Sequence, residues 1–250
     1  MPTALVTGAS SGIGAEFARQ LAARGYELVL VARRAERLEE LAAALPGEPV
    51  VIPHDLANDA AALPPELERR GISVDLLVNN AGFGSHGRFW EQDPAREAEQ
   101  VRLNCEAVVV LTGTLLPAMV ERRSGGVIVV ASTAGMQPLP YQATYAASKA
   151  FALNFTDALA TELRGTGVRA MSVNPGPVPT EWQAVAGFEG GEDKIPGKIE
   201  AAQVVAESLD AFDAGKRSVI PGGLMRWVMR VSSLSPRAIQ LRVVERQYRP

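Results

Sequence analysis

The chain has 250 residues, 47% of them hydrophobic, which is enough to bury a large core within one α/β domain. Its 25 basic and 28 acidic residues nearly cancel, so nucleic acid is not expected as a partner. A single cysteine excludes an internal disulfide, and with two histidines we expect no metal site. The N-terminus lacks signal-peptide features and no apolar run reaches about 20 residues, so we expect a cytoplasmic location.

Short apolar runs alternate with longer helical patterns along the chain. Strands are predicted at residues 4–7, 27–32, 50–53, 76–79, 127–131, 169–174 and 218–220. Helices are predicted between them, at residues 13–24, 35–45, 59–70, 95–121, 143–164 and 201–212. This alternation is typical of a parallel sheet with helices on both faces. We therefore expect a single α/β domain over residues 1–250, a Rossmann-type doubly wound sheet of about seven parallel strands.

The first predicted strand runs into a glycine-rich turn, Thr7-Gly-Ala-Ser-Ser-Gly-Ile-Gly14, which leads into a helix. Glycines there permit a tight turn and a close approach of the backbone to a pyrophosphate, and the helix N-terminus attracts its negative charge. The spacing differs from the Gly-x-Gly-x-x-Gly dinucleotide fingerprint. The predicted cofactor-binding residues in this turn are Gly8, Ser10, Ser11, Gly12, Ile13 and Gly14.

The same turn contains Gly8-x-Ser10-x-Gly12, the pattern of a hydrolase nucleophile elbow. An elbow on the first strand leaves no earlier strand to carry oxyanion-hole groups. The two histidines, His54 and His86, also lie early in the chain. A hydrolase is therefore the weaker interpretation.

Ser132 closes an apolar run, and a Tyr-x-x-x-Lys motif follows at Tyr145 and Lys149. Positions i and i+4 share one face of a helix, so the Lys149 ammonium can lie beneath the Tyr145 phenol. A free tyrosine has a pKa of about 10, and we expect the nearby cation to lower it toward the range useful for acid–base catalysis. Ser132 is expected to hold the substrate oxygen that receives the proton. Alone, this short motif is a weak signal.

With both motifs present, the chain resembles the short-chain dehydrogenase/reductase family, in its compact single-domain branch. The resemblance covers nearly the whole chain and includes an Asn-Asn-Ala-Gly motif at residues 79–82. It implies hydride transfer between a nicotinamide cofactor and a carbonyl or alcohol. The catalytic residues that it implies are Asn104, Ser132, Tyr145 and Lys149.

The resemblance also assigns roles to residues outside the glycine turn. Lys149 would bind the nicotinamide ribose, Asn104 would hold a water that links Lys149 to solvent, and Asp55 would contact the adenine. Asp55 has an alternative interpretation as a helix-capping or turn residue. The implied cofactor contacts are Asp55, Leu56, Asn80, Ala81, Gly82, Tyr145, Lys149, Pro175, Gly176, Val178 and Thr180.

The end of the second predicted strand bears on the choice of cofactor. NAD-binding sites usually carry an acidic residue about 20 residues after the glycine turn, whereas this chain has Arg33 and Arg34 at that strand's end. Guanidinium groups suit a 2′-phosphate because they donate paired, charge-assisted hydrogen bonds. We predict that NADP(H) is preferred over NAD(H), with Arg33 as the main phosphate contact. The alternative is that both arginines merely begin a charged helix surface.

Residues 176–198 resemble the mobile substrate lid of the family, because glycines suit hinges and Trp182 and Phe188 could close over a ligand. Met136 and Tyr141 are expected to line the same pocket, together with Ser132. No charged residue stands out as a partner for a substrate carboxylate or phosphate. An apolar ketone, aldehyde or secondary alcohol is therefore the expected small-molecule substrate.

Residues 221–250 form a basic amphipathic tail in which six arginines alternate with apolar residues. Such a segment can lie on an anionic membrane surface, but a subunit contact or a lid-supporting helix is the favoured interpretation. The family resemblance implies a homodimer or homotetramer. A non-enzymatic NADP(H)-binding sensor or scaffold on the same fold is the alternative to an enzyme, and a dehydratase or epimerase is the alternative reaction.

Overall fold

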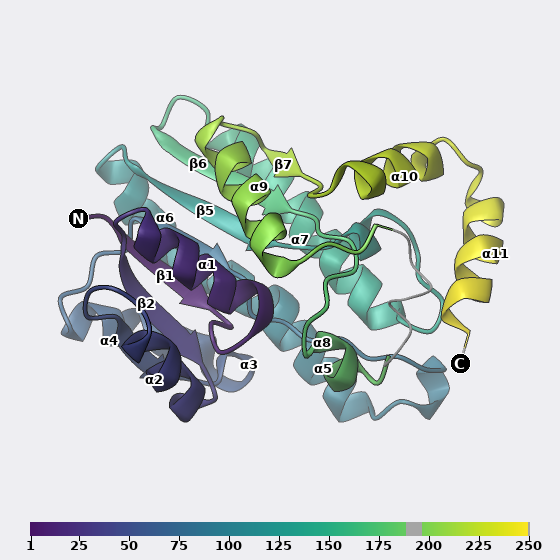
Figure 1. Cartoon of the computed structure of the whole chain (residues 1–250), viewed down its shortest axis with the longest axis horizontal. Helices are drawn as coiled ribbons and strands as arrows, with labels where there is room; N and C mark the ends of the chain where they lie inside the picture. Colours follow the sequence, from purple (N-terminus) through teal and green to yellow (C-terminus); the bar gives the residue numbers. More distant parts are fainter. Residues whose placement is uncertain (189–196, 250) are drawn as a thin grey trace.

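A computed structural model of the protein describes residues 1–188 and 197–249, and its centre is a seven-stranded parallel sheet of order β3-β2-β1-β4-β5-β6-β7 (Figure 1). The predicted sheet is thereby confirmed, with strand bounds close to those expected. In chain order the strands are β1 (Thr3–Thr7), β2 (Glu27–Ala32), β3 (Val50–Pro53), β4 (Leu76–Asn79), β5 (Gly125–Val130), β6 (Val168–Val173) and β7 (Ser218–Val219).

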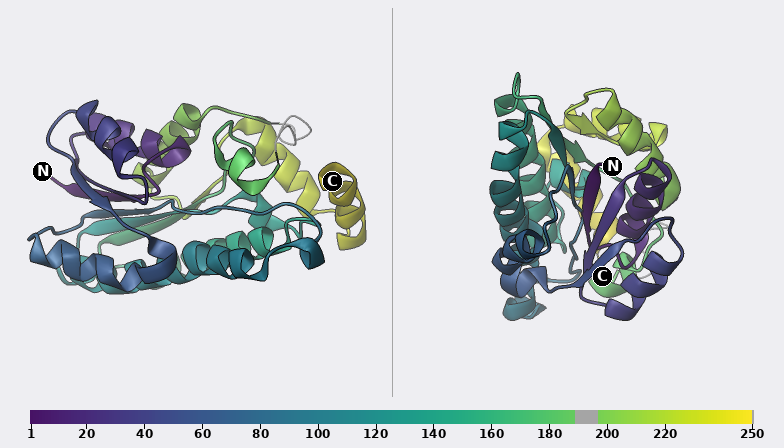
Figure 2. Two further views of the ribbon diagram at one scale, coloured as in Figure 1. Left: turned by 90° about the horizontal axis from the view of Figure 1, so that it is seen from below. Right: turned by 90° about the vertical axis from the view of Figure 1, so that its left-hand side faces the viewer.

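Helices cover both faces of the sheet, as Figure 2 shows. Each face has its own apolar core, with Phe17 fully buried in one and Leu111 fully buried in the other. One layer contains α1 (Gly12–Ala23), α2 (Ala35–Ala43) and α9 (Ala201–Asp213). The other contains α4 (Leu63–Arg69), α5 (Pro94–Val101), α6 (Ala107–Glu121) and α7 (Ala143–Glu162).

One of the predicted helices is divided in the structure, and another contains an irregular turn. The predicted helix at residues 59–70 is replaced by α3 (Leu56–Asp59), η1 (Ala60–Ala62) and α4. Pro64 and Pro65 lie in the first turn of α4, where a missing N–H breaks no helical hydrogen bond. The predicted helix at residues 95–121 contains a π-helical turn, η3 (Arg102–Glu106), between α5 and α6.

The stretch Pro94–Glu121 is long and apolar enough, by length and composition, to cross a membrane. Its most apolar window is 33% buried. Leu111 and Met119 on its inner side belong to a sheet core and are fully buried. Core helices of soluble proteins pass the same test of length and composition, so this helix is weak evidence for a membrane span.

Four further elements lie in or beside the tail and the predicted lid. They are η4 (Thr133–Met136), α8 (Trp182–Ala186), α10 (Gly223–Ser233) and α11 (Arg237–Tyr248). In Figure 1, α10 and α11 extend from the main body near the carboxyl ends of the strands. The tail is therefore helical, and it lies at the end of the sheet where parallel α/β domains bind ligands.

The strand order changes direction between β1 and β4, and Thr7 joins these two strands at their carboxyl ends. Its hydroxyl accepts hydrogen bonds from the backbone N–H groups of Asn80 (2.9 Å) and Ala81 (3.0 Å). The same hydroxyl donates to the carbonyl of Val78 over 3.2 Å. The turns after β1 and β4 are thus held side by side at the topological switch point, where dinucleotides bind in this class of fold.

Candidate active site

The glycine turn after β1 has a backbone that larger residues could not follow. Gly8 and Gly12 have φ values of +66° and +55°, which favour glycine because it has no Cβ. A Cβ on Gly14 would lie 2.3 Å from the Gly8 carbonyl oxygen, so α1 begins directly against the turn. This close-packed cradle at the N-terminus of α1 fits the pyrophosphate of a dinucleotide.

A cavity of about 400 Å³ opens at the carboxyl ends of the strands, beside this cradle. Its lining includes every predicted cofactor residue except Gly14. Of the four predicted catalytic residues, Ser132, Tyr145 and Lys149 line the cavity, whereas Asn104 lies outside its lining. The structure therefore brings the two sequence motifs into one site.

Ser132 follows β5 and caps the short helix η4. Its Oγ accepts a hydrogen bond from the backbone N–H of Ala134 (3.0 Å) and donates to the carbonyl of Pro175 (3.4 Å). The hydroxyl also lies close enough to the phenol of Tyr145 to lower its pKa. Tyr145 lies in the first turn of α7 and is 9% exposed, so the two hydroxyl groups meet at the buried wall of the cavity.

Burial raises the pKa of Tyr145 to about 12, and the neighbouring Ser132 hydroxyl offsets only part of this rise. The Lys149 nitrogen lies 5.9 Å from the centre of the phenol ring. The expected lowering of the Tyr145 pKa by Lys149 is therefore wrong for the protein alone, because desolvation outweighs the neighbouring cation. The phenol stays protonated at neutral pH.

Lys149 is itself buried, and its nitrogen donates a 2.8 Å hydrogen bond to the carbonyl of Val130. Burial lowers the pKa of its ammonium to about 8, with a small opposing effect from Cys105. The lysine is thus close to its own titration point near neutral pH. Such a group can release and regain a proton readily.

Asn104 lies in the π-helical turn η3 and is 2% exposed. Its Nδ2 donates to the carbonyl of Phe83 and to Ser148 Oγ, each at 2.9 Å, and its Oδ1 accepts from the Phe83 N–H. A Cβ on Gly82 would lie 2.9 Å from that same Oδ1 and 3.4 Å from the Lys149 nitrogen. The π turn thus places Asn104 behind the cavity wall, close to Lys149.

The two predicted phosphate-binding arginines have different partners. Arg34 donates to Ser10 Oγ (3.0 Å) and Ser11 Oγ (2.9 Å) of the glycine turn, and it pairs with Glu181 (2.8 Å). Arg33 pairs with Glu99 at 3.2 Å. Arg34, rather than Arg33, therefore contacts the turn in this structure, although both line the cavity.

Glu181 was not identified from the sequence. Hydrogen bonds from Arg37 and Arg34 hold the pKa of its carboxyl below the usual value. Glu181 follows β6, and its ion pair with Arg34 links that segment to the end of β2. The only feature of the sequence that could have indicated Glu181 is that it is a charged residue in the predicted lid.

Asp55 caps α3, with its carboxylate accepting from the Ala57 N–H (3.0 Å) and from Asn58 Nδ2 (2.8 Å). The alternative interpretation of Asp55 as a capping residue is therefore confirmed. Asp55 and Leu56 also line the cavity, so the capped turn forms its wall near β3. An adenine contact by Asp55 stays a prediction.

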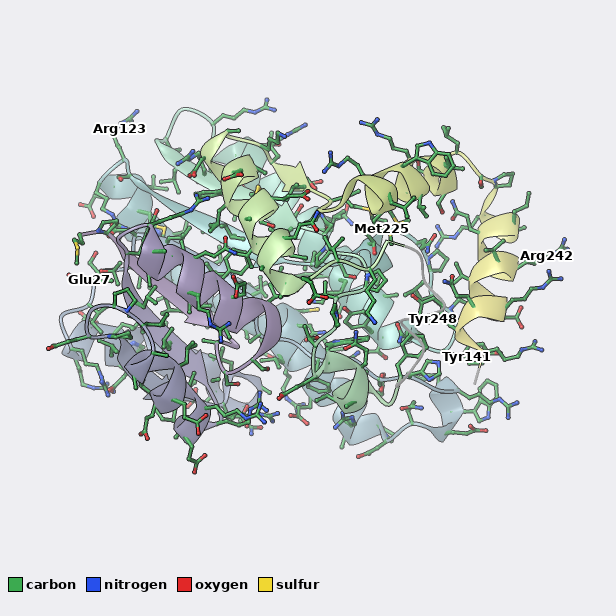
Figure 3. The ribbon with its side chains drawn as sticks, in the orientation of Figure 1. Glu27, Arg123, Tyr141, Met225, Arg242 and Tyr248 are labelled. Atoms are coloured by element: carbon green, nitrogen blue, oxygen red, sulfur yellow. The ribbon has the colours of Figure 1, made fainter. Side chains whose placement is uncertain are left out.

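The other end of the cavity is walled by aromatic residues. The rings of Tyr145 and Trp182 are 4.8 Å apart, and Phe188 stacks on Tyr248 at 5.1 Å with an interplanar angle of 8°. The Nε2 of His86 lies 2.7 Å from the backbone carbonyl of Tyr248 and fixes the end of α11 there. Figure 3 shows Tyr248 on the side of α11 that faces the domain.

Tyr248 was also not identified from the sequence. The sequence pattern indicates a basic amphipathic tail at residues 221–250 and does not indicate that one of its residues lines the pocket. Burial, with a contribution from Tyr145, raises the pKa of its phenol. Val244, one turn earlier, is 4% exposed and packs in a cluster with Tyr145. The spacing of Val244 and Tyr248 at i and i+4 was the signal for an inward face. The prediction of a tail that supports the pocket is thus consistent with these contacts.

Gln142 is a further lining residue without a sequence motif. Its side chain is 2% exposed, and its Nε2 has no hydrogen-bond partner among the described residues. A buried, unpaired amide donor is unfavourable. This N–H group is therefore available to a ligand that enters the cavity.

Two residues expected to contact the substrate do not line this cavity. Met136 is 37% exposed, and Tyr141 has a left-handed backbone with φ of +67°. The Tyr141 carbonyl accepts from the Gly87 N–H at 2.9 Å, which fixes it in a surface turn. Of the predicted lid, residues 189–196 lie outside the described part of the chain.

The hydrolase alternative has no supporting geometry. Ser10 Oγ accepts hydrogen bonds from Arg34. His54 Nε2 lies 2.6 Å from the Asp59 carbonyl, and His86 is bound to the carbonyl of Tyr248. Neither imidazole contacts Ser10, so no nucleophile–base pair is formed at this turn.

Dinucleotide-binding domains hold a pyrophosphate at the switch point of a parallel sheet, and here a buried tyrosine faces the same cavity. These features are typical of a dinucleotide-binding α/β protein. Residues 2–187 match the short chain dehydrogenase family, and the chain belongs to the short-chain dehydrogenase/reductase family.

The chain is similar in structure to a short-chain dehydrogenase from Sphingobium yanoikuyae in complex with NADPH, with a TM-score of 0.83, 32% identity and 93% of each chain covered. It is also similar to the bulky-bulky ketone specific alcohol dehydrogenase from Comamonas testosteroni, with a TM-score of 0.78, 29% identity and coverage of 95% and 96%. A family member from Burkholderia phymatum with the same fold, a TM-score of 0.83, 24% identity and coverage of 93% and 92%, was solved with NAD.

In sequence, the chain is 38% identical over 182 residues to the very-long-chain 3-oxoacyl-CoA reductase of Pyrenophora tritici-repentis. This alignment covers 68% of the chain and 53% of that reductase. For the first five curated relatives, the matched share of their own length runs from 53% to 70%. The chain therefore spans less than two thirds of the length of most of these relatives.

Proposed function

We propose that the protein is an NADP(H)-preferring reductase of apolar ketones or aldehydes, able to run in reverse on the secondary alcohol. The observation that carries the proposal is the meeting of Ser132 and Tyr145 in a cavity with an aromatic wall. The hydroxyl groups define where a carbonyl oxygen would lie, and the wall defines what its substituents would contact.

Ser132 and Tyr145 both act on the substrate oxygen in this proposal. When bound, the nicotinamide supplies or accepts the hydride. The pKa of about 12 keeps the Tyr145 phenol protonated at neutral pH, ready to donate to a carbonyl oxygen that gains charge. The Ser132 hydroxyl holds the same oxygen by a hydrogen bond.

Lys149 and Asn104 restore the proton to Tyr145. The pKa of about 8 lets the Lys149 ammonium release a proton near neutral pH and recover it. Asn104 lies behind Gly82, next to the lysine nitrogen, and is held by Phe83 and Ser148. From there it orients a water molecule that connects Lys149 to solvent.

The preference for NADP(H) rests on the arginines at the end of β2. Arg34 reaches both serines of the glycine turn, and Arg33 lines the cavity beside it. A guanidinium at this position favours a 2′-phosphate, whereas NAD usually meets an acidic residue there. The NADPH held by the Sphingobium relative supports the same choice.

The substrate class rests on the far end of the cavity. Trp182, Phe188 and Tyr248 offer ring surfaces, and Gln142 offers one unpaired N–H donor. Ligand pockets of this kind take a mainly apolar molecule oriented by a few polar contacts. The bulky ketones accepted by the Comamonas relative are consistent with such a substrate.

The test is NADPH oxidation by the purified protein across carbonyls graded from small and polar to bulky and aromatic. We expect turnover of the bulky apolar members. Tyr145→Phe should lower this turnover by about 1,000-fold, within the range for loss of a general acid. NADPH binding, followed by fluorescence, should change little in the same variant.

Retained turnover in Tyr145→Phe would overturn the assignment of the proton donor. If NADPH bound and no carbonyl reacted, the alternative of a cofactor-binding sensor would be favoured. Preference for small polar carbonyls over bulky ones would contradict the proposed substrate class while leaving the catalytic assignment intact.

A further inference from the structure

The exposed sides of α10 and α11 carry apolar and basic side chains, which we call together the tail surface. Its apolar members include Trp227 at 63% exposed and Leu234 at 86% exposed. Gln240 of α11 donates to the carbonyls of Ser232 and Ser235 and ties the two helices together. The tail surface consists of Leu224, Trp227, Val231, Leu234, Ile239 and Val243, with Arg226, Arg230, Arg237, Arg242 and Arg246.

The apolar side chains of α10 form a stripe rather than a scatter. Residues 224, 227, 231 and 234 are spaced so that they share one face of the helix. The opposite side of α10 is already used, because Met225 and Met229 are buried, and Met225 packs against Gly176 beside the cavity. A helix with only a structural role would present a polar face to water. This one presents a second apolar face.

Positive charge on the tail surface exceeds what the described acidic residues neutralise. Arg226 pairs with Glu207, but Arg230, Arg237, Arg242 and Arg246 form no ion pair with any described residue. Residues 221–250 contain a single acidic residue, Glu245, which pairs with Arg249. In Figure 3, Arg242 extends away from the domain. The surface thus joins exposed apolar area to an excess of positive charge.

Further exposed aromatic residues lie at the same end of the molecule. Phe89 and Trp90 are 61% and 78% exposed, with Arg88 over the indole ring of Trp90 at 5.9 Å. They follow His86, which contacts the Tyr248 carbonyl at the end of α11. The exposed aromatic residues therefore flank the aromatic wall of the cavity.

We propose that the tail surface docks on an anionic lipid bilayer. Basic amphipathic helices lie at the interface, with apolar side chains among the acyl chains and arginines near lipid phosphates. Tryptophan favours the same depth. A second copy of the chain is a poorer occupant, because a two-fold contact brings each arginine-rich face onto its own kind, and like charges repel.

This proposal does not depend on the catalytic assignment. Docking would place the aromatic end of the cavity next to the bilayer, where apolar carbonyl compounds dissolve. Lipid binding itself is measured without substrate or turnover. Failure of the proposed reductase activity and failure of docking are therefore separate results.

The experiment is co-sedimentation of the full chain with vesicles of phosphatidylcholine, alone or with about 30% phosphatidylserine, the anionic lipid of cytoplasmic leaflets. We expect binding to the anionic vesicles at about 0.15 M salt and its loss at about 1 M salt, where charges are screened. Each arginine near an anionic surface contributes about fivefold to partitioning. Arg242→Glu/Arg246→Glu should therefore lower it by at least about 25-fold.

Two matched variants complete the test. Trp227→Ala/Leu234→Ala removes exposed apolar area without a change in charge, and should lower binding by about tenfold. Arg164→Glu/Lys216→Glu makes the same change in charge as the double arginine variant, but at exposed positions beside the amino end of the sheet. It should bind like the unaltered protein. Thermal unfolding checks that each variant is folded.

Three results would overturn the proposal. The first is no binding to anionic vesicles. The second is binding that both glutamate variants lower equally, which would reflect net charge alone. The third is a concentration-dependent dimer in sedimentation equilibrium that is lost in Trp227→Ala/Leu234→Ala, which would assign the tail surface to a second copy.

Discussion

The nitrogen of Lys149 donates a 2.8 Å hydrogen bond to the carbonyl of Val130, the last residue of β5. This bond fixes the lysine across the wall of the cavity. One carbonyl does not replace the hydration of an ammonium ion, so burial lowers the lysine pKa from 10.5 to about 8. The buried position that suits Lys149 for proton transfer therefore lowers the free energy of unfolding of the protein.

We predict that Lys149→Met changes the pH dependence of stability. The lowered pKa means that the unfolded chain binds more protons between about pH 8 and 10.5, so wild-type stability rises with pH across that window. The free energy of unfolding of wild type relative to the variant should rise by about 3 kcal/mol over it. Urea titrations at several pH values measure this difference.

The effect of Tyr145 is common to both proteins and cancels in that comparison. The carbonyl of Val130 loses its partner in the variant, but this adds an offset that does not vary with pH. A constant stability difference from about pH 7.5 to 10.5, within about 1 kcal/mol, would contradict a lysine pKa near 8 in the folded protein.

Asn104→Ala should be destabilising as well as inactivating. Its amide is bonded to both backbone groups of Phe83 and to Ser148, all in a buried setting. Truncation leaves those groups unpaired, so we expect a loss of about 2–4 kcal/mol in the free energy of unfolding. Thr114→Ala on the exposed side of α6 is the control and should cost well under about 1 kcal/mol. Chemical denaturation of both variants gives the comparison.

Sequence patterns predict the parts of this molecule that depend on local spacing. The alternation of strands and helices indicates the parallel sheet, and the glycine turn and Tyr145-x-x-x-Lys149 each lie within a single strand–helix or helix segment. The connectivity of a parallel sheet then brings the carboxyl ends of its strands together. Ser132 follows β5 and the glycine turn follows β1, so both are expected at the same edge of the sheet.

What the sequence did not predict depends on contacts between distant segments or on burial. Glu181 meets Arg34 and Tyr248 meets Phe188 only because the folded chain brings them together. The raised pKa of Tyr145 follows from desolvation, which spacing alone does not report. The π turn at Asn104 lies inside a continuous helix, and the hydrophobic pattern gives no sign of it.

Both arginines at the end of β2 should contribute to the preference for NADPH over NADH. Arg33→Asp and Arg34→Asp should each weaken NADPH far more than NADH, because a carboxylate repels the 2′-phosphate that a guanidinium binds. The sequence favours Arg33 as the main contact of the 2′-phosphate. The hydrogen bonds that Arg34 donates to Ser10 and Ser11 favour Arg34 for the same role. Kd values for both cofactors measured by fluorescence titration rank the two.

Arg37→Gln is the matched control, since Arg37 pairs with Glu181 but does not line the cavity. Its NADPH to NADH affinity ratio should change by less than about threefold, because rim charges contribute little. Equal losses for both cofactors in the Arg33 and Arg34 variants would refute the proposed NADP(H) preference.

Tyr248 should limit the size of the substrate. Tyr248→Ala removes a ring that stacks on Phe188, and kcat/KM for carbonyls with bulky substituents should rise by about tenfold relative to small ones. Tyr248→Phe keeps the ring and should leave this ratio nearly unchanged. Steady-state kinetics with paired ketones measure it. A ratio that Tyr248→Ala does not alter would place the substrate elsewhere in the cavity.

The wall that Tyr248 forms comes from a part of the chain beyond residues 2–187, the portion that matches the family. The glycine turn, Ser132, Tyr145 and Lys149 all lie within that stretch, while α11 comes from a later part of the chain and closes the other end of the pocket. Exchange of α10 and α11 between family members would therefore change the shape of the pocket wall and leave the glycine turn and the Tyr145–Lys149 pair unchanged.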